Sequence, residues 1–296
     1  MNKNESNTIV LVNPRAGRGR ASACLKDFRN LASAEGLQMD TWMTEYPGHA
    51  RNLAAKALEE GIERLIVIGG DGTLSEVADV IAGSEISLGI VPSGTGNDIA
   101  RSIGITAGRV DQAFRKIING DTIRSDVAEE LISGRRFISF AGCGFPASVA
   151  EKANSMKLLK GRMVFFVSLY AVVKEMKAFP VSLEIDGVRE ETVCTSVMVH
   201  NTPFTGGGLK IAPGAEIDDG YLEVVLVGEI GTLELMANFP RLYSGNHLRH
   251  PAFRMVRGRK ISIVMPGRQL VSYDGETDFA RELDIQVNQG AIKLIV

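Results

Sequence analysis

The chain has 296 residues, of which 45% are hydrophobic and 23% are charged, and its formal net charge at pH 7 is −2. This length allows two domains, or one large one, with a packed core. The composition is ordinary for a globular protein, and the small net charge argues against binding of nucleic acid over a broad basic surface. The three cysteines, Cys24, Cys143 and Cys194, are far apart, which excludes a Cys-x-x-Cys zinc site and argues against a disulfide framework.

The N-terminal residues are polar and lead directly into an apolar run, without the apolar region of a signal peptide, so we expect a cytoplasmic protein. The most apolar segment, residues 163–173, has about eleven residues, whereas a spanning helix needs roughly 20. Two interpretations of the wider segment 156–177 remain open. It is either a buried helix with charged ends, or a surface that touches a membrane.

The first part of the chain alternates strand-like and helix-like segments. We expect strands at residues 8–12, 38–44, 65–68 and 87–91, and helices at 21–34, 50–60, 74–82, 99–103 and 110–119. Repeated β-α units predict a doubly wound parallel sheet that binds ligands at the carboxyl ends of its strands. The sequence therefore predicts an N-terminal α/β domain that spans residues 1–127.

The pattern changes after Asp126. Short or alternating apolar runs predict strands at residues 129–141, 181–190, 192–200, 220–227, 260–265 and 283–287, and two helical segments interrupt them at 162–177 and 232–243. These strands read as antiparallel, because turn residues separate them. We expect a β-rich, antiparallel, sandwich-like C-terminal domain over residues 128–296.

Two glycine-rich loops carry most of the functional information. Gly69-Gly70-Asp71-Gly72-Thr73 and Pro92-Ser93-Gly94-Thr95-Gly96-Asn97-Asp98 each follow an expected strand and each lead into an expected helix. Such turns aim free backbone N–H groups at an anion, and glycine permits the close backbone approach that a phosphate requires. Neither loop has the Walker or the G-x-G-x-x-G sequence, so the usual P-loop and dinucleotide fingerprints do not apply.

The acidic residue of the loop at residues 69–73 has two interpretations. Asp71 can cap the helix that begins near Leu74, because aspartate is a favoured capping residue. Within a phosphate site its carboxylate would repel the ligand unless a magnesium ion lay between them. The hydroxyls of Thr73 and Thr95 suit phosphate oxygens as hydrogen-bond donors.

Together with Asn13-Pro14-Arg15-Ala16-Gly17, these loops resemble the catalytic domain of the diacylglycerol kinase family, which includes sphingosine kinases, ceramide kinases and bacterial soluble lipid kinases. Thr44, followed by Pro47-Gly48-His49-Ala50, resembles a second nucleotide segment of that family. The resemblance implies an ATP-binding first domain and a lipid-substrate second domain. The residues that it assigns to the nucleotide are Asn13, Pro14, Arg15, Ala16, Gly17, Thr44, Gly70, Asp71, Gly72, Thr73, Leu74, Ser75, Glu76, Thr95, Asn97 and Asp98.

The resemblance also implies a structural Mg²⁺ site in the turn that contains Glu216, Asp219 and Tyr221, with Tyr221 supplying its carbonyl oxygen. Carboxylates and carbonyls at such spacing suit a hard cation, although a plain type I turn would look similar. The family often has Asp where this chain has Glu216. Asp126 resembles a further member of the acidic network, and a plain turn aspartate is the alternative.

Asp274-Gly275-Glu276 resembles the catalytic acidic pair of the family. An exposed hairpin turn is the alternative, because the turn reaches the glycine loops only if the second domain folds back over the first. Phosphoryl transfer to an alcohol needs an acceptor for the hydroxyl proton. We expect Glu276 to be this general base, with Asp274 orienting it or holding metal, and the sequence does not separate the two roles.

The sequence thus predicts a lipid kinase that transfers the γ-phosphate of ATP to a diacylglycerol-like lipid, with ATP and Mg²⁺ bound and the active site between the domains. Expected partners are the lipid at a membrane surface, met through transient peripheral contact, and no nucleic acid; a homodimer stays open. Alternative acceptors are a sphingoid base, a glycerophospholipid or, less readily, NAD. The alternative class is a catalytically silent regulator that binds nucleotide or lipid.

Overall fold

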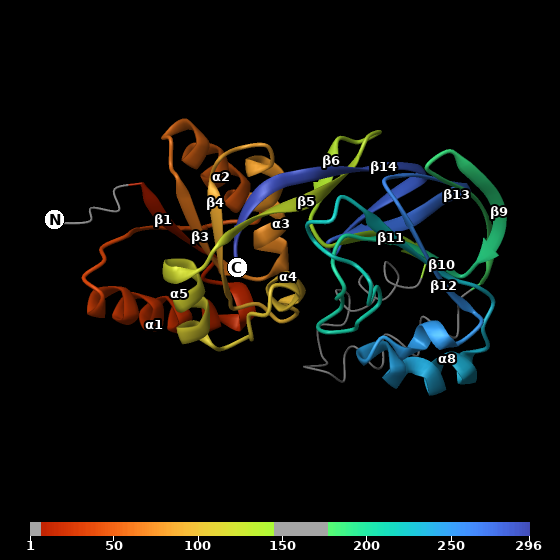
Figure 1. The fold of residues 1–296 in the computed structure, drawn as a ribbon, viewed down its shortest axis with the longest axis horizontal. Coiled ribbons are helices and arrows are strands. Elements are labelled where there is room, and N and C mark those ends of the chain that lie inside the picture. Colours follow the sequence, from red (N-terminus) through yellow and green to blue (C-terminus); the bar gives the residue numbers. More distant parts are fainter. Residues whose placement is uncertain (1–6, 145–176) are drawn as a thin grey trace.

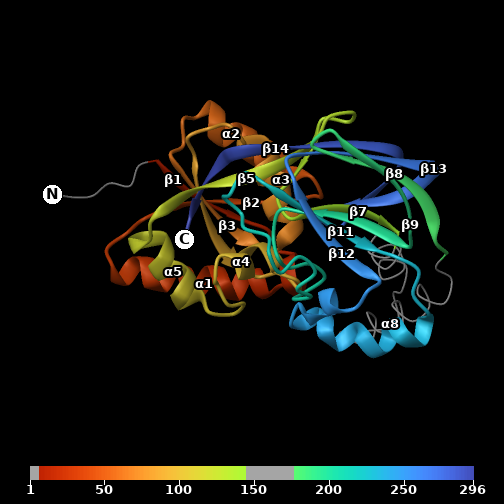
Figure 2. The same ribbon diagram turned by 45° about the vertical axis from the view of Figure 1, so that its right-hand side comes forward.

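The computed structural model describes residues 7–144 and 177–296. These residues form two lobes that lie side by side (Figures 1 and 2). In the described part of the chain, 14 strands join into one continuous hydrogen-bonded sheet that runs through both lobes. The first lobe is α/β and the second is mainly antiparallel, which confirms the predicted fold class.

The first lobe contains four parallel strands in the order β2-β1-β3-β4. Each strand is followed by a helical segment, and helices cover both faces of the sheet, with α1 and α5 on one side and α2 and α3 on the other (Figure 1). The bounds are β1 Thr8–Val12, η1 Ala16–Arg18, α1 Arg20–Ala34, β2 Asp40–Met43, α2 His49–Glu59, β3 Arg64–Gly69, α3 Asp71–Ile81, β4 Ser87–Pro92, α4 Asp98–Ser102 and α5 Val110–Asn119.

Burial explains why these segments lack the alternating pattern of an exposed sheet. The strands β1 and β3 are buried along almost their whole length, because both of their faces meet helices. The helices turn small or apolar side chains toward the sheet, for example Ala54 and Ala57 of α2 and Phe28 of α1. Phe28 makes an edge-to-face contact with Phe114 of α5, with ring centroids 5.3 Å apart.

The second lobe is a strongly curved antiparallel sheet. Its strands are β6 Arg135–Phe137, β7 Phe140–Gly144, β8 Phe179–Ile185, β9 Val188–Cys194, β10 Ser196–His200, β11 Leu222–Val227, β12 Phe253–Gly258 and β13 Lys260–Tyr273. Their inner faces share one core that includes Val181, Val197 and Ile263. The edge strands β9 and β12 meet through an ion pair between Glu190 and Arg254, so the sheet curls toward closure.

A short helical layer packs on the outside of this sheet. It consists of α8 Thr232–Asn238, η2 Phe239–Tyr243 and η3 Asn246–Arg249. Leu235, Phe239 and Leu242 from this layer form a separate apolar cluster with residues of β11 and β12. The helix expected at residues 232–243 is therefore present, with a 3₁₀ second half.

Two long strands connect the lobes. β5 (Thr122–Glu130) leaves the first lobe and pairs with β14 (Glu276–Ile295), which returns to the first lobe. The end of β14 lies beside β4, with Leu294 paired in parallel with Leu88. The end of β14 therefore extends the parallel sheet of the first lobe.

Some expected elements differ in extent. The single strand expected at residues 181–190 is a hairpin instead, because Asp186 and Gly187 take positive φ angles of 49° and 84° and reverse the chain. The strands expected at 260–265 and 283–287 are parts of the much longer β13 and β14. The helix expected at 162–177 lies outside the described residues. No helix among the described residues is long and apolar enough to span a membrane.

Candidate active site

Three loops meet at the carboxyl ends of β1, β3 and β4. They are residues 13–17, residues 69–73 and residues 93–97, and the parallel strand order brings them to the same edge of the sheet. Their glycines allow contact that a larger residue would prevent. A Cβ built on Gly94 would lie 2.5 Å from Gly70 Cα, and one built on Gly17 would lie 1.9 Å from the Ser93 carbonyl oxygen.

Hydrogen bonds tie the three loops together. Asn13 Nδ2 donates to Thr73 Oγ1 at 2.9 Å, which joins the first loop to the second. Arg20 Nη2 donates to the Gly94 carbonyl at 2.6 Å, and its Nε donates to the Gly17 carbonyl at 3.1 Å, which joins the first loop to the third. The loops therefore form one preorganised unit.

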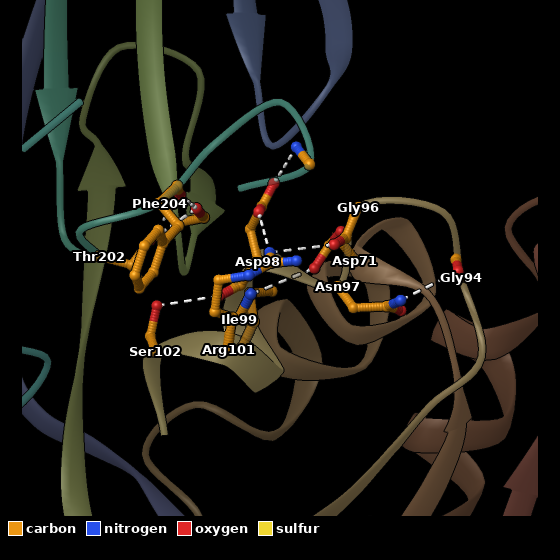
Figure 3. Close-up of polar contacts among 12 residues, drawn as sticks. Asp71, Gly94, Gly96, Asn97, Asp98, Ile99, Arg101, Ser102, Thr202 and Phe204 are labelled. Carbon is orange, nitrogen blue, oxygen red and sulfur yellow. Dashed lines mark hydrogen bonds and ion pairs between the residues drawn. The ribbon is translucent and has the colours of Figure 1, made fainter. Parts of the chain in front are cut away.

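Asp71 caps a helix, but not the helix that its own loop opens. Its Oδ1 accepts the Ile99 N–H at 3.2 Å, at the beginning of α4 (Figure 3). Burial raises the pKa of the Asp71 carboxyl, while backbone N–H groups at this helix start, including those of Asn97 and Asp98, counteract the rise. The neighbouring α3 begins after Gly70 with no side-chain cap, so its first N–H groups remain available for an anion.

Asp98 joins the third loop to the second lobe. Its Oδ1 accepts a bond from Arg101 Nη1 at 2.7 Å, and its Oδ2 accepts the Gly207 N–H at 2.8 Å (Figure 3). Burial, and to a smaller extent the charge of Asp71, raise the pKa of Asp98 to about 6. Two carboxylates thus lie in a partly desolvated site between the lobes.

Two buried polar atoms in the third loop lack a partner among the described residues. Ser93 Oγ and Asn97 Oδ1 make no hydrogen bond to them. Asn97 also has a φ of 53°, a left-handed conformation that is uncommon for residues other than glycine. Because unpaired buried polar groups are costly, their occurrence here indicates a site that a ligand completes.

The Asp-Gly-Glu turn reaches the first lobe. Asp274 and Gly275 form the two-residue turn between β13 and β14, with φ angles of 48° and 96°, as a type I′ hairpin requires. Ser75 Oγ of α3 donates a hydrogen bond to Asp274 Oδ2. The second lobe therefore folds back on the helix that follows the second glycine loop.

The two acidic residues of this turn have very different surroundings. Asp274 Oδ1 accepts the N–H groups of Ser139 and Phe140, and Oδ2 accepts that of Ile138, each at 2.9 Å. Burial raises the pKa of the Asp274 carboxyl, and these donors oppose the rise. Glu276, in contrast, has a side chain that is 58% exposed and lies 3.7 Å from Arg135 Nη2.

A second acidic turn, which contains Glu216, Asp219 and Tyr221, lies at the junction of the two lobes. The Asp126 carboxylate is buried and accepts the N–H groups of Gly220 at 2.6 Å and Gly290 at 2.7 Å. Asp219 accepts the Tyr221 N–H at 2.9 Å through Oδ1, and Arg257 Nη2 lies 2.9 Å from Oδ2. Asp126 thus joins this turn, through Gly220, to β14, through Gly290.

The fit of a cation to this turn rests on few side chains. No group of three His, Cys, Asp or Glu residues within the described ranges is arranged to hold a metal ion. Asp219 Oδ2 is buried and makes no well-directed hydrogen bond to the described residues, and Glu216 is exposed. Backbone carbonyl oxygens, such as that of Tyr221, would have to complete a magnesium site here.

The remaining predicted nucleotide residues lie around the loops with different exposures. Arg15 and Thr95 are exposed, and Thr44 is buried at the end of β2, where its N–H donates to the Val12 carbonyl at 2.9 Å. The Leu74 side chain is buried in the core and its N–H donates to the Gly70 carbonyl at 3.1 Å. Pro14, Ala16, Gly72 and Glu76 belong to the same loops or to the first turns of α3.

Sequence reasoning missed two residues that hold the site together. Arg20 fastens the first loop to the third, and Gly207 carries the N–H that reaches Asp98. The Gly206-Gly207-Gly208 run was a usable signal, because consecutive glycines permit the positive φ angles that all three residues take in the structure. Nothing local in the sequence distinguished Arg20 from Arg18, and both residues are exposed in the structure.

A parallel α/β lobe with phosphate-type glycine loops, joined to a β-rich lobe that supplies an acidic turn, defines the class of an ATP-dependent kinase. Comparison with protein families gives two matches: residues 7–129 match the diacylglycerol kinase catalytic domain, and residues 139–296 match the YegS C-terminal NAD kinase beta sandwich-like domain. The chain therefore belongs to the diacylglycerol kinase family of two-domain lipid kinases.

Named relatives agree with this assignment. The chain is similar to a diacylglycerol kinase of Mycobacterium tuberculosis (strain CDC 1551 / Oshkosh), with 29% identity over 284 residues that cover 94% of this chain and 91% of the relative. It is also similar to a diacylglycerol kinase of Staphylococcus saprophyticus, with 28% identity over 270 residues, or 90% and 88% of the two chains.

Solved structures show the same fold. A crystal structure of a Bacillus anthracis str. Sterne protein aligns with a TM-score of 0.78 and 27% identity, covering 98% of this chain and 96% of that chain. A second structure, of a diacylglycerol kinase from the same organism, aligns with a TM-score of 0.73 and 23% identity over the same shares. The two-lobe arrangement described above is thus shared with experimentally determined structures.

Proposed function

We propose that this protein transfers the γ-phosphate of ATP to the hydroxyl of a diacylglycerol-like lipid, with Mg²⁺, at the junction of the two lobes. One observation carries the proposal. The Asp274-Gly275-Glu276 turn, from the far end of the sequence, is bonded through Ser75 to the helix that the second glycine loop opens. A phosphate-type site and an exposed carboxylate are thereby brought to the same region of the molecule.

The nucleotide would bind at the three joined loops. The uncapped beginning of α3 offers the N–H groups of the second loop to a phosphate. Ser93 Oγ and Asn97 Oδ1 are buried and have no hydrogen-bond partner among the described residues. A bound nucleotide would give them partners. We propose that residues 13–17 and Thr44 complete this site.

We assign the general base to Glu276. The Asp274 carboxylate already receives four donors, so its lone-pair positions are occupied, whereas the Glu276 carboxylate is largely exposed. In the proposed step, the lipid hydroxyl oxygen forms a bond to the γ-phosphorus and the bond from that phosphorus to the β-phosphate oxygen breaks. The hydroxyl proton goes to Glu276, and ADP leaves.

Magnesium would contribute in two places. Bound with the nucleotide, it would neutralise the negative charge of the transferring phosphoryl group. In the turn of residues 216–221, Asp219, Glu216 and the Tyr221 carbonyl would hold a structural ion. Asp126, whose carboxylate is taken up by Gly220 and Gly290, would position that turn.

Other acceptors fit the same chemistry. A sphingoid base or a glycerophospholipid also presents a hydroxyl, and NAD is less favoured because the Pro-x-Gly-Thr-x-Asn-Asp loop of this chain belongs to the lipid kinase pattern. A lipid acceptor would require transient contact with a membrane surface. A catalytically silent regulator is the alternative class, and the intact pair of Asp274 and Glu276 argues against it.

The test is transfer of label from γ-labelled ATP, with Mg²⁺, to a panel of lipids in mixed micelles. The panel contains diacylglycerol, sphingosine, ceramide, a monoacylglycerol and a lysophospholipid, and NAD serves as the soluble comparison. We expect label in diacylglycerol at a rate well above that in the other acceptors. Label in NAD alone, or in no acceptor despite ATP binding, would overturn the proposal.

A further inference from the structure

The hydrogen bond between Ser75 and Asp274 joins two segments that are 199 positions apart in the sequence. Ser75 lies in α3, directly after the second glycine loop. Asp274 is the first residue of the turn that Glu276 follows. The bond therefore connects the two halves of the proposed active site directly.

The Asp274 end of this bond is rigidly held. Three successive N–H groups, those of Ile138, Ser139 and Phe140, donate to its carboxylate at 2.9 Å. Its own N–H donates to the Phe140 carbonyl at 2.9 Å. Residues 138–140, at the connection from β6 to β7, thus hold the turn through hydrogen bonds. Among the described residues of the first lobe, Ser75 is the only one that donates to this carboxylate.

The backbone at Asp274 adds a further constraint. Its φ of 48° is uncommon for a residue other than glycine. Aspartate tolerates this conformation better than most residues do, because its short polar side chain can accept nearby backbone N–H groups. The carboxylate bonds therefore fix the turn in which Tyr273 and Glu276 pair across the hairpin.

We propose that Ser75 and Asp274 are a positioning pair, which sets the Glu276 carboxylate relative to the phosphate loops. Ser75 then acts on the turn and not as a ligand of the nucleotide, and Asp274 does not accept the substrate proton. This inference rests on the proposed function, because it assigns the base to Glu276. It differs from the nucleotide-binding role that the sequence suggested for Ser75, and for Asp274 it selects the orienting role over the alternative of holding a metal ion.

Ser75→Ala removes the hydroxyl and leaves α3 intact, because alanine is a good helix former. We expect kcat for lipid phosphorylation to fall about 10- to 100-fold, since small misplacements of a catalytic group have effects of this size. The Kd and KM for ATP should stay unchanged. Ser75→Thr keeps a hydroxyl and should restore most of the activity.

Ser84→Ala is the matched control. The Ser84 hydroxyl also makes one hydrogen bond, from the Ile86 N–H at 3.3 Å, but this bond stays within the first lobe. Its kinetics should match those of the wild type. A rise in the Kd for ATP with unchanged kcat in Ser75→Ala would identify Ser75 as a nucleotide ligand and overturn the proposal, and so would unchanged kinetics.

A second measurement separates this proposal from the proposed function. Backbone amide hydrogen exchange in the turn 274–277, without nucleotide or lipid, should be faster in Ser75→Ala than in the wild type and in Ser84→Ala. Faster exchange in a protein that phosphorylates no lipid would refute the lipid kinase assignment and leave the structural pair intact. Unchanged exchange in an active lipid kinase would refute the pair alone.

Discussion

At the scale of single residues, the site is notable for carboxylates that the fold surrounds with N–H donors. Asp71, Asp98, Asp126 and Asp274 all accept backbone N–H groups, and burial raises the pKa of each. Glu276 differs, because most of its side chain is exposed. Most acidic residues that the sequence marks as functional therefore organise loops and turns, which leaves Glu276 accessible to a substrate.

Asp98 gives a prediction about pH. Its pKa rises from 3.8 to about 6 on folding, so the folded protein binds this proton more tightly than the unfolded chain does. The resulting stabilisation is fully present below about pH 4 and is lost as the pH rises through about 6, and it amounts to roughly 3 kcal/mol. The side chain of Asp98→Asn does not titrate. When the pH rises from 4.5 to 8, the free energy of unfolding of this variant should therefore fall by less than that of the wild type.

Urea denaturation at the two pH values, without nucleotide and magnesium, measures this difference. The exposed Asp40 on β2 provides the control, because Asp40→Asn should keep the pH dependence of the wild type. The same pH dependence in Asp98→Asn and in the wild type would show that Asp98 titrates normally in the folded protein.

At the scale of elements, the glycine loops work as a unit because they touch. Gly70 and Gly94 approach backbone to backbone, and Gly17 approaches the Ser93 carbonyl. Side chains then fasten the loops at Asn13 and Arg20. The spacing of the glycines is thus a packing requirement of three adjacent loops as well as a way to expose N–H groups.

Gly94→Ala tests this packing. The added Cβ would lie 2.5 Å from Gly70 Cα and 3.0 Å from Asn97 Oδ1, so the loops must separate. We expect a loss of about 1–3 kcal/mol in the free energy of unfolding, which is typical of overpacking, together with weaker ATP binding. Gly267→Ala is the control, because a Cβ there meets nothing within 4 Å. Equal stability and ATP affinity in the two variants would refute the packing argument.

At the scale of the whole molecule, the sequence predicted the local units well. The parallel strands, their helices and the antiparallel second half were visible from the periodicity of apolar residues and from the turn residues between them. The loops and the Asp-Gly-Glu turn were recognisable because their glycines and acids are adjacent in sequence. Each of these signals depends on neighbours within a few positions.

The parts that the sequence did not predict depend on distant pairings. The return of β14 to β4 places Leu294 beside Leu88, and no local pattern encodes that pairing. Capping of its own helix was one of the two interpretations of Asp71, but its carboxylate caps α4 instead, because the third loop packs against the second. The different surroundings of Asp274 and Glu276 also depend on distant segments, because Ser75 and residues 138–140 donate hydrogen bonds to the Asp274 carboxylate.

We propose that Glu276 accepts the proton of a lipid hydroxyl at a site assembled from both lobes. The most direct test is the kcat of Glu276→Gln for phosphorylation of diacylglycerol, measured together with the Kd for ATP. We predict that kcat falls about 10²- to 10⁴-fold, the usual contribution of a general base, while the affinity for ATP is unchanged. A variant that keeps kcat within about threefold of the wild type would contradict the assignment of the base and, with it, the account of the site.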